Sequence, residues 1–352
     1  MGGRRHAWVD AGRGLAILLV VFVHAEEWLL RAGFDVRPWH AVNGVLVGMR
    51  MPLFFTVSGV LGAGWLARSW SLTFSRKVGF LLWVYLVWQP IGLLASLMAD
   101  QFTGHRQTVF HFVAALAATT VRPRSELWFL WALAAYFALA WACRRVPALL
   151  QLAVAAGVAA VCLSGVVRVP AGWNLVPNFH VFFLLGLHHR DVLLWTADRV
   201  VSARRTGAAI IGAWIAVATV SALFGLELYI GVGLGIRVLG LASGVVLAVW
   251  LTSSRLLRYL GSRTLPIYLA HTPVLLGLVW WAYASRDEPV IASVGPLLPL
   301  IATAVSVGAS LALHAVLRRT PARYLYEPPE GVTAALEQLA STAGVGRRRR
   351  VG

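Results

Sequence analysis

Long apolar runs separated by short polar stretches make up most of the chain. They give ten candidate membrane spans, at 14–30, 42–66, 78–98, 127–143, 149–168, 178–188, 208–226, 236–251, 266–284 and 291–317. Most of these runs approach the ~20 residues that one helix needs to cross the hydrocarbon core of a bilayer. The pattern therefore predicts an all-α membrane protein, built as a bundle of ten transmembrane helices.

The composition favours the same class. Of the 352 residues, 59% are hydrophobic and only 13% are charged, and the mean hydropathy is +0.73. A soluble protein of this size needs more polar surface to cover its core. The basic start leads into an apolar run, as a secretion signal does. Because no small-residue cleavage site follows, we expect this run to remain as the first helix.

The distribution of basic residues predicts the topology. Two segments are ambiguous: 178–188 is short for a span, and 107–121 is apolar enough to be an eleventh. With ten spans and both termini cytoplasmic, 22 of the 31 Lys and Arg residues lie inside, 8 lie outside, and Arg50 falls within a span. This asymmetry obeys the positive-inside rule. Segment 107–121 is then an extracytoplasmic or re-entrant helix.

The net charge of +17 is explained by the basic residues in the loops between spans. We therefore expect the lipid bilayer, and no nucleic acid, as a partner. We predict a multi-pass protein of the plasma (inner) membrane, with one transmembrane domain over 1–317 and a basic cytoplasmic tail over 318–352. The tail holds a short amphipathic pattern at 334–342 and is expected to be solvated. Cys143 and Cys162 lie in apolar runs and imply neither a disulfide framework nor a metal site.

Ionisable groups at membrane depth are costly and are candidates for function. Arg13 and His24 are eleven positions apart, so both side chains lie on one helix face, roughly 16 Å apart along the axis. Arg13 is expected at the cytoplasmic interface and His24 near the midplane. An arginine that obeys the positive-inside rule and a histidine bonded to a neighbouring helix are the alternative interpretation.

Three further groups lie at depth. Arg50 is roughly 12 Å into its span and needs an anionic partner, for which the candidates are Glu26, Glu27, Glu126 or a bound ligand. His271 follows Pro266 and precedes Pro273, two prolines that should bend its helix. His180 is expected to be a satisfied core histidine.

A polar interior with a basic cytoplasmic mouth suits anionic molecules that enter from the cytosol. A histidine near the midplane can remove a proton from a hydroxyl or an amine. These features fit group transfer within the membrane. They fit equally a proton-coupled transporter or exporter of a polar metabolite, and residue types alone do not separate the two.

Five motifs in order carry a resemblance to a known family. They are "VDAGRGLAILLVVFVH" (9–24), "MPLFFTVSGVL" (51–61), "ELWFLWALAAYF" (126–137), "FFLLG" (182–186) and "LGSRTLPIYLAH" (260–271). In these motifs the chain resembles the acyltransferase family 3, ten-span membrane enzymes that acylate sugars, glycolipids, peptidoglycan and some antibiotics.

The resemblance implies an O-acyltransferase that uses cytoplasmic acyl-coenzyme A, most simply acetyl-coenzyme A, as a donor substrate, with no bound cofactor. The acceptor would be a hydroxyl of a carbohydrate, a glycolipid or a glycosylated metabolite. By this resemblance His24 is the general base or the acyl carrier, and Arg13 anchors the donor or holds the helix start with Asp10. The residues expected to line the substrate pocket are Arg50, Ser58, Glu126, Tyr268 and His271.

The donor phosphates would meet Arg13, Arg76 and Lys77. Here the chain departs from the family, many of whose members carry two arginines three residues apart in this loop. In "SRKVGF" the second of these positions is Gly79. Arg68 is therefore expected to share the phosphate role with Arg76.

Overall fold

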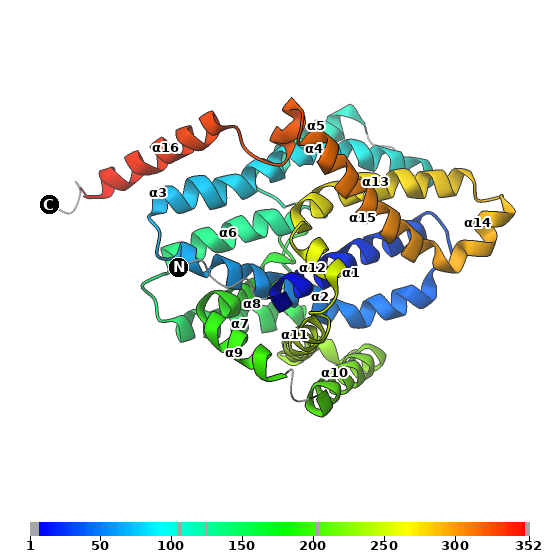
Figure 1. The fold of residues 1–352 in the computed structure, drawn as a ribbon, viewed down its shortest axis with the longest axis horizontal. Helices are drawn as coiled ribbons and strands as arrows, with labels where there is room; N and C mark the ends of the chain where they lie inside the picture. The colour runs from blue at the N-terminus through cyan, green and yellow to red at the C-terminus, as the bar shows by residue number, and fades with distance from the viewer. Residues whose placement is uncertain (1–6, 104–107, 124, 201–203, 349–352) are drawn as a thin grey trace.

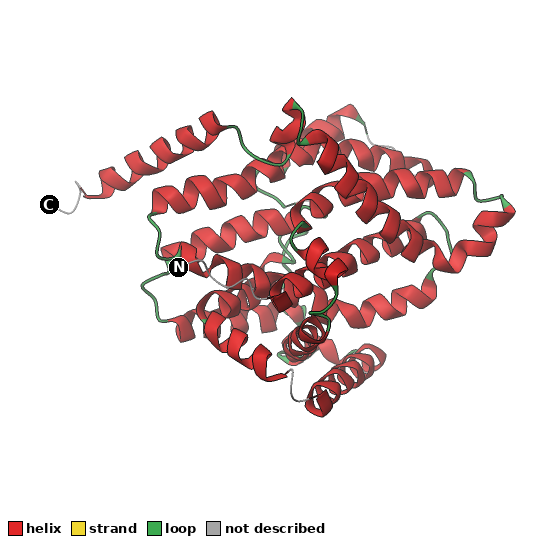
Figure 2. Ribbon diagram, in the orientation of Figure 1, coloured by secondary structure: helices red, strands yellow, loops and turns green. Residues whose placement is uncertain are grey.

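The computed structural model describes residues 7–103, 108–123, 125–200 and 204–348. Within these ranges all regular structure is helical, as predicted, and no strand occurs (Figure 2). The basic residues before Ala7, residue 107 of the predicted 107–121 segment and the last four residues of the tail lie outside the described ranges.

Among the described residues, seven helical segments are long and apolar enough to cross a membrane. They are built on α1 (Ala7–Arg31), α2 (Arg37–Gly62), α4 (Gly79–Thr103), α10 (Arg204–Phe224), α11 (Val232–Trp250), α13 (Thr264–Ala284) and α15 (Leu298–Leu317). These helices confirm seven of the predicted apolar elements as continuous helices. The total of ten spans and the cytoplasmic termini stay predictions.

Four apolar helices are shorter than a full crossing. They are α5 (Val109–Ala118), α6 (Trp128–Ala142), α7 (Ala148–Leu163) and α8 (Val176–His188). The last three occupy the predicted spans 127–143, 149–168 and 178–188. Because ~20 residues are needed for one crossing, none of α6, α7 and α8 is long enough by itself to span a bilayer.

The remaining elements are short connecting helices and one terminal helix. They are η1 (Ala63–Trp65), α3 (Trp70–Thr73), the π-helical η2 (Phe74–Val78), α9 (Arg190–Val200), η3 (Leu226–Leu228), α12 (Arg255–Gly261), α14 (Pro289–Val294), η4 (Gly295–Leu297), η5 (Pro321–Leu325) and α16 (Glu330–Arg348).

The first helix is the centre of the bundle. It packs against α2, α11, α12, α13 and α15, and Figure 1 shows it surrounded by these elements. The tightest crossings are made by glycines, as is common between membrane helices. A Cβ on Gly261 would lie 1.7 Å from the Asp10 carbonyl oxygen, and one on Gly186 would lie 1.9 Å from that of Thr56. Backbone therefore meets backbone where α12 crosses α1 and where α8 crosses α2.

The connection between α5 and α6 is tied to the bundle at two points. The buried hydroxyl of Tyr85 on α4 donates to the Thr119 carbonyl at 2.9 Å, and the hydroxyl of Tyr268 on α13 donates to the Glu126 carbonyl. Glu126 is thereby fixed next to the second turn of α13.

The tail is folded back on the bundle. Its helix α16 spans 19 residues, longer at both ends than the amphipathic pattern at 334–342, and it packs on α3 and η2. The Ser71 hydroxyl donates to the Glu337 carbonyl at 3.0 Å, and Leu336 covers Gly79 so closely that a Cβ there would lie 2.6 Å from its Cδ1. The expectation of a solvated tail is therefore wrong for this helix, because its apolar side has a partner.

Candidate functional site

Two histidines that are far apart in the sequence meet between α1 and α13. The ring centroids of His24 and His271 are 5.4 Å apart, with 36° between the ring planes. His271 is completely buried, while about a fifth of the His24 side chain is exposed (19%). One imidazole is thus held inside the protein, and its neighbour faces a space that another molecule can reach.

The backbone of α13 fixes the orientation of His271. Its Nδ1 lies 2.6 Å from the Tyr268 carbonyl oxygen, which can only accept, so this nitrogen is assigned the proton. The other ring nitrogen, Nε2, lies 3.3 Å from the Thr272 hydroxyl. Pro273 follows directly and has no N–H, which frees the Leu269 carbonyl from the helical ladder.

His24 faces a carboxylate. Its Nδ1 lies 3.7 Å from Glu27 Oε2, close enough for electrostatic attraction but too far for a direct hydrogen bond. Glu27 is itself bonded by Arg31 one turn later. A negative charge on this side favours a proton on Nδ1 and leaves Nε2 as the basic nitrogen of the ring.

Arg13 lies on the same face of α1, as its spacing from His24 indicated. Its Nη2 donates to the Thr264 hydroxyl at 2.7 Å, and its Nη1 lies 3.8 Å from Asp10 Oδ1. Thr264 is the first residue of α13. The helix that carries His271 is therefore tied at its start to Arg13, so that both polar positions of α1 contact α13.

Arg50 is buried and reaches a carboxylate through an amide. Its Nη1 donates to Asn43 Oδ1 at 3.4 Å, and Asn43 Nδ2 donates to Glu26 Oε2 at 3.3 Å. His40 Nδ1 lies 3.1 Å from the other oxygen of Glu26. The charges of Glu27 and Glu26 both attract the guanidinium. Of the three carboxylates proposed as partners, Glu26 and Glu27 lie on the arginine's side, and Asn43 makes the link to Glu26.

Tyr268 connects the histidine pair to the loop before α6. Its ring centroid lies 5.7 Å from that of His271 and 5.5 Å from that of Phe129, and its hydroxyl holds the Glu126 carbonyl. Glu126 is thus brought to the centre through its backbone, and its side chain is half-buried. Ser58 donates to the Phe54 carbonyl of its own helix at 2.8 Å, so that bond does not tie it to the histidine pair.

The predicted donor residues lie around η2 and the end of α2. Lys77 is half-buried, with its Nζ 4.8 Å from the centre of the Phe137 ring, and its charge and that of Arg13 repel each other. Arg76 and Arg68 are exposed. The mutual repulsion of Lys77 and Arg13 indicates a common electropositive region that would be relieved by an anion.

Sequence reasoning missed the uncharged polar partners. Asn43 and Thr272 are ordinary residues within apolar runs, Thr264 lies just before one, and only their contacts distinguish them. Thr264 had a signal, because the late motif contains a serine or threonine before the tyrosine and histidine. The prediction for His180 is wrong in one respect: its Nε2 is buried without a hydrogen-bond partner in the described part of the chain.

The comparisons with known proteins identify one family. The sequence matches the family described as "Acyltransferase domain" over residues 6–315. No curated protein and no solved structure matches the chain. The match covers α1, α2, α13 and the other elements that form the histidine centre.

Proposed function

Because the chain belongs to this acyltransferase family, we propose that it is a membrane O-acyltransferase that uses cytoplasmic acyl-coenzyme A. The acyl group is most simply acetyl, and the acceptor is a hydroxyl of a carbohydrate, a glycolipid or a glycosylated metabolite. The observation that carries the proposal is the pair of imidazoles from α1 and α13, of which His271 is buried and His24 is partly exposed. Arg13 lies near the start of α1 and bonds the first residue of α13.

The donor occupies the basic end of the bundle. Its phosphates pair with Arg13, Arg76 and Lys77, with Arg68 at the edge, and its thioester extends along α1 toward His24. Arginine and lysine side chains suit this task because charge-assisted hydrogen bonds to phosphate are strong. The repulsion between Lys77 and Arg13 supports this assignment, because bound phosphate would lower their energy together.

In the transfer step His24 Nε2 removes the proton from the acceptor hydroxyl. The hydroxyl oxygen attacks the thioester carbonyl carbon, a C–O bond forms, and the C–S bond breaks. The coenzyme A sulfur leaves with the electron pair and takes up the proton from His24. Glu27 stabilises the imidazolium that exists between these events, since it lies 3.7 Å from Nδ1. A variant of this path has His24 carry the acyl group briefly before transfer.

The remaining predicted residues position the acceptor. His271, oriented by the Tyr268 carbonyl, lies beside His24, and Tyr268 holds the loop that contains Glu126. Arg50 and Ser58 belong to α2 on the other side of α1. In this proposal the protein has ten spans, both termini are cytoplasmic, and it resides in the plasma membrane, so that the donor comes from the cytosol.

The test is acyl transfer by the purified protein in detergent. We expect His24→Ala to lower transfer from acetyl-coenzyme A by roughly 10²- to 10⁴-fold, the usual contribution of a general base, with an unchanged thermal unfolding midpoint. His111→Ala is the matched control, because His111 is exposed and its ring contacts Thr108 at the start of its own helix rather than the pair. Wild-type rates in purified His24→Ala would rule out the catalytic assignment.

The same assay separates the enzyme from a proton-coupled transporter. In detergent there are no two compartments and no gradient, so transport cannot occur. Transfer of the acyl group, or hydrolysis of the donor, under these conditions supports the enzyme. Mass spectrometry of cell-envelope glycans and secreted metabolites with and without the gene would then identify the acceptor by a difference of one acyl unit.

A further inference from the structure

Two of the residues assigned to donor binding lie on an unusual turn. Between α3 and α4 the chain forms the π-helical turn η2, which contains Arg76 and Lys77. The Gly79 N–H donates to the carbonyl of Phe74, five residues earlier, and this is the hydrogen bond that defines a π-helix. Such turns are rare, occur mostly as single bulges within α-helices, and are frequent at functional sites. A rare backbone conformation persists only where its surroundings hold it.

The π-helical turn determines where the two basic side chains project. One residue of a helix corresponds to about 100° of rotation about the axis, and a change from π to α hydrogen bonding shifts the register by one residue. In the observed register Arg76 is exposed, and Lys77 lies over the Phe137 ring, with its Nζ 4.8 Å from the ring centre. An α-helical turn in the same place would point both side chains in other directions.

The C-terminal helix α16 packs on the hydrogen bond of this turn. It contacts α3, η2 and α4, and Figure 1 shows it beside α3. A Cβ on Gly79 would lie 2.6 Å from Leu336 Cδ1 and 3.1 Å from the Phe74 carbonyl oxygen. Leu336 therefore covers the Gly79–Phe74 bond and keeps water from competing for it. One turn of helix away, the Ser71 hydroxyl donates to the Glu337 carbonyl at 3.0 Å.

Contacts further along α4 fix the tail in one register. The indole N–H groups of two α4 tryptophans donate to carbonyls of the segment that precedes α16. Trp83 bonds the Tyr324 carbonyl at 2.8 Å, and Trp88 bonds the Leu325 carbonyl at 2.7 Å. The tail is thus bonded to the α3–α4 segment on both sides of the π-helical turn, which sets the position of α16 along it.

The helix α16 lies outside the residues that match the family. That match ends at residue 315, and α16 begins at Glu330. One side of α16 is committed to the bundle, since Leu336 is half-buried and Ala340 is buried, whereas Leu339 on another side is 64% exposed. A segment beyond the matched domain therefore supports the turn that carries two donor residues.

We propose that α16 maintains the π-helical turn and that Leu336 is a positioning residue for the donor. The inference rests on the proposed acyltransferase function and extends its donor site to the tail. Leu336 acts through the Gly79–Phe74 bond, and the turn that this bond closes sets the directions of Arg76 and Lys77. Without the contact, the turn relaxes toward α-helical hydrogen bonding, and both basic side chains leave the donor phosphates.

The first measurement needs no donor. Hydrogen–deuterium exchange of the purified full-length protein in detergent reports the protection of the Gly79 amide in peptides that cover 74–80. We expect Leu336→Ala to speed this exchange by about tenfold, because one hydrogen bond loses its cover, with unchanged exchange in α1 and α13. Leu339→Ala is the matched control, since Leu339 lies on the same helix and is 64% exposed.

The second measurement is steady-state transfer from acetyl-coenzyme A. We expect Leu336→Ala to raise the KM by about tenfold, because Arg76 and Lys77 are both displaced, and to leave kcat within about twofold. Leu336→Met should keep the wild-type KM, since methionine fills a similar volume. Ser71→Ala removes the bond to the Glu337 carbonyl and should raise the KM by less.

Each outcome decides between this inference and the proposed function. Unchanged exchange in Leu336→Ala would overturn the inference, and so would faster exchange with a wild-type KM or a fall in kcat alone. Calorimetric binding of coenzyme A to the same variants gives the comparison without any transfer. Absence of transfer by the wild-type protein would instead overturn the proposed function, and exchange and binding would still decide whether α16 maintains the turn.

Discussion

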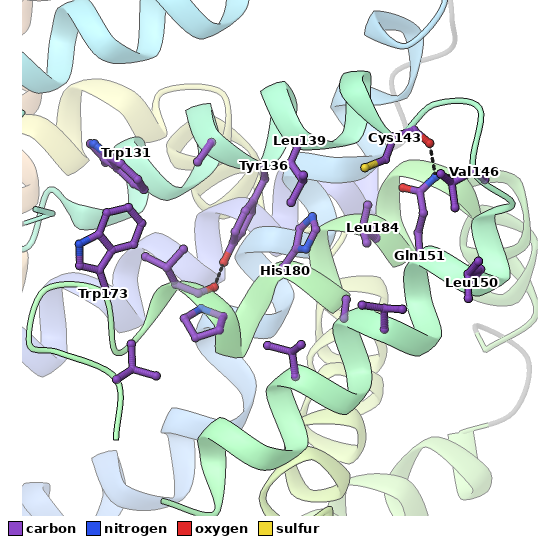
Figure 3. Close-up of a pocket in the computed structure, with 17 residues that line it drawn as sticks. Trp131, Tyr136, Leu139, Cys143, Val146, Leu150, Gln151, Trp173, His180 and Leu184 are labelled. Atoms are coloured by element: carbon purple, nitrogen blue, oxygen red, sulfur yellow. Dashed lines mark hydrogen bonds between the residues drawn. The ribbon is translucent and has the colours of Figure 1, made fainter. Parts of the chain in front are cut away.

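The histidine centre and the groove of about 740 Å³ between α6, α7 and α8 are both built from helices rich in apolar residues, but they differ in how many polar side chains contact one another (Figure 3). Around His271 and Arg50, polar side chains bond to each other, to hydroxyls or to carbonyls. In the groove, His180 keeps an unsatisfied nitrogen among apolar neighbours. The long helices α1, α2 and α13 carry these polar contacts, whereas the short α6, α7 and α8 line the groove with mostly apolar side chains.

The difference teaches where selectivity resides. A centre whose polar groups mostly contact one another is preorganised for one chemical step. The groove instead offers mostly apolar surface, so that selectivity there would rest on size and apolarity. The following changes separate these two regions, beginning with the one that should disrupt both.

The largest effect is expected at the seam between the regions, where α8 crosses α2. In Gly186→Ala the new Cβ would lie 1.9 Å from the Thr56 carbonyl oxygen, so the two helices must move apart. We expect a loss of about 3 kcal/mol of stability, seen as a lower thermal unfolding midpoint in detergent together with lost transfer. Gly157→Ala on α7 is the control, because its Cβ meets nothing within 4 Å; equal midpoints for the two variants would contradict the close crossing.

The next effect concerns the buried charges of the histidine centre. Glu26 is 2% exposed, and Glu26→Gln removes a negative charge that attracts Arg50. We expect a loss of about 2 kcal/mol, the usual worth of hydrogen bonds to charged groups, again measured as thermal unfolding. Glu27 is 43% exposed, so Glu27→Gln should lower the stability less than Glu26→Gln does. It should lower the rate of acyl transfer more, because Glu27 faces His24. If the two variants lose stability equally, burial does not set the strength of this network.

A smaller effect is expected where α1 holds the start of α13. Thr264→Val keeps the shape of the side chain and removes the acceptor of the 2.7 Å bond from Arg13. We expect a cost of about 1 kcal/mol and a KM for acetyl-coenzyme A that is raised several-fold, with a smaller change in kcat. Thr303→Val on α15 is the control, since its hydroxyl bonds the Pro299 carbonyl of its own helix; a KM that does not change in Thr264→Val would remove Arg13 from donor binding.

The smallest effect is expected at the exposed edge of the donor region. Arg76→Ala should raise the KM for acetyl-coenzyme A by about threefold at low ionic strength and by less at 0.5 M salt, because screening weakens exposed charge pairs. The measurement is steady-state transfer at two salt concentrations. Arg319→Ala provides a comparison on another exposed arginine, and an equal response of both variants would argue for a general surface charge effect.

Some structural features followed directly from local sequence pattern. The face shared by Arg13 and His24 depends only on helical periodicity, and the structure places both against α13. Arg50 was recognised as buried and in need of an anionic partner because a guanidinium is costly at depth. The relay through Asn43 could not be seen, since a neutral amide within an apolar run has no distinctive pattern.

The sequence by itself determined the helical membrane class, the family and the polar positions of the first helix, because hydropathy and periodicity are properties of neighbouring residues. Only the tertiary structure decided that His271 meets His24, that α16 packs on η2, and that α6, α7 and α8 enclose a groove. These features depend on where helices cross and how far each one extends, and crossings are set by small residues such as Gly186 whose partners are remote in the chain.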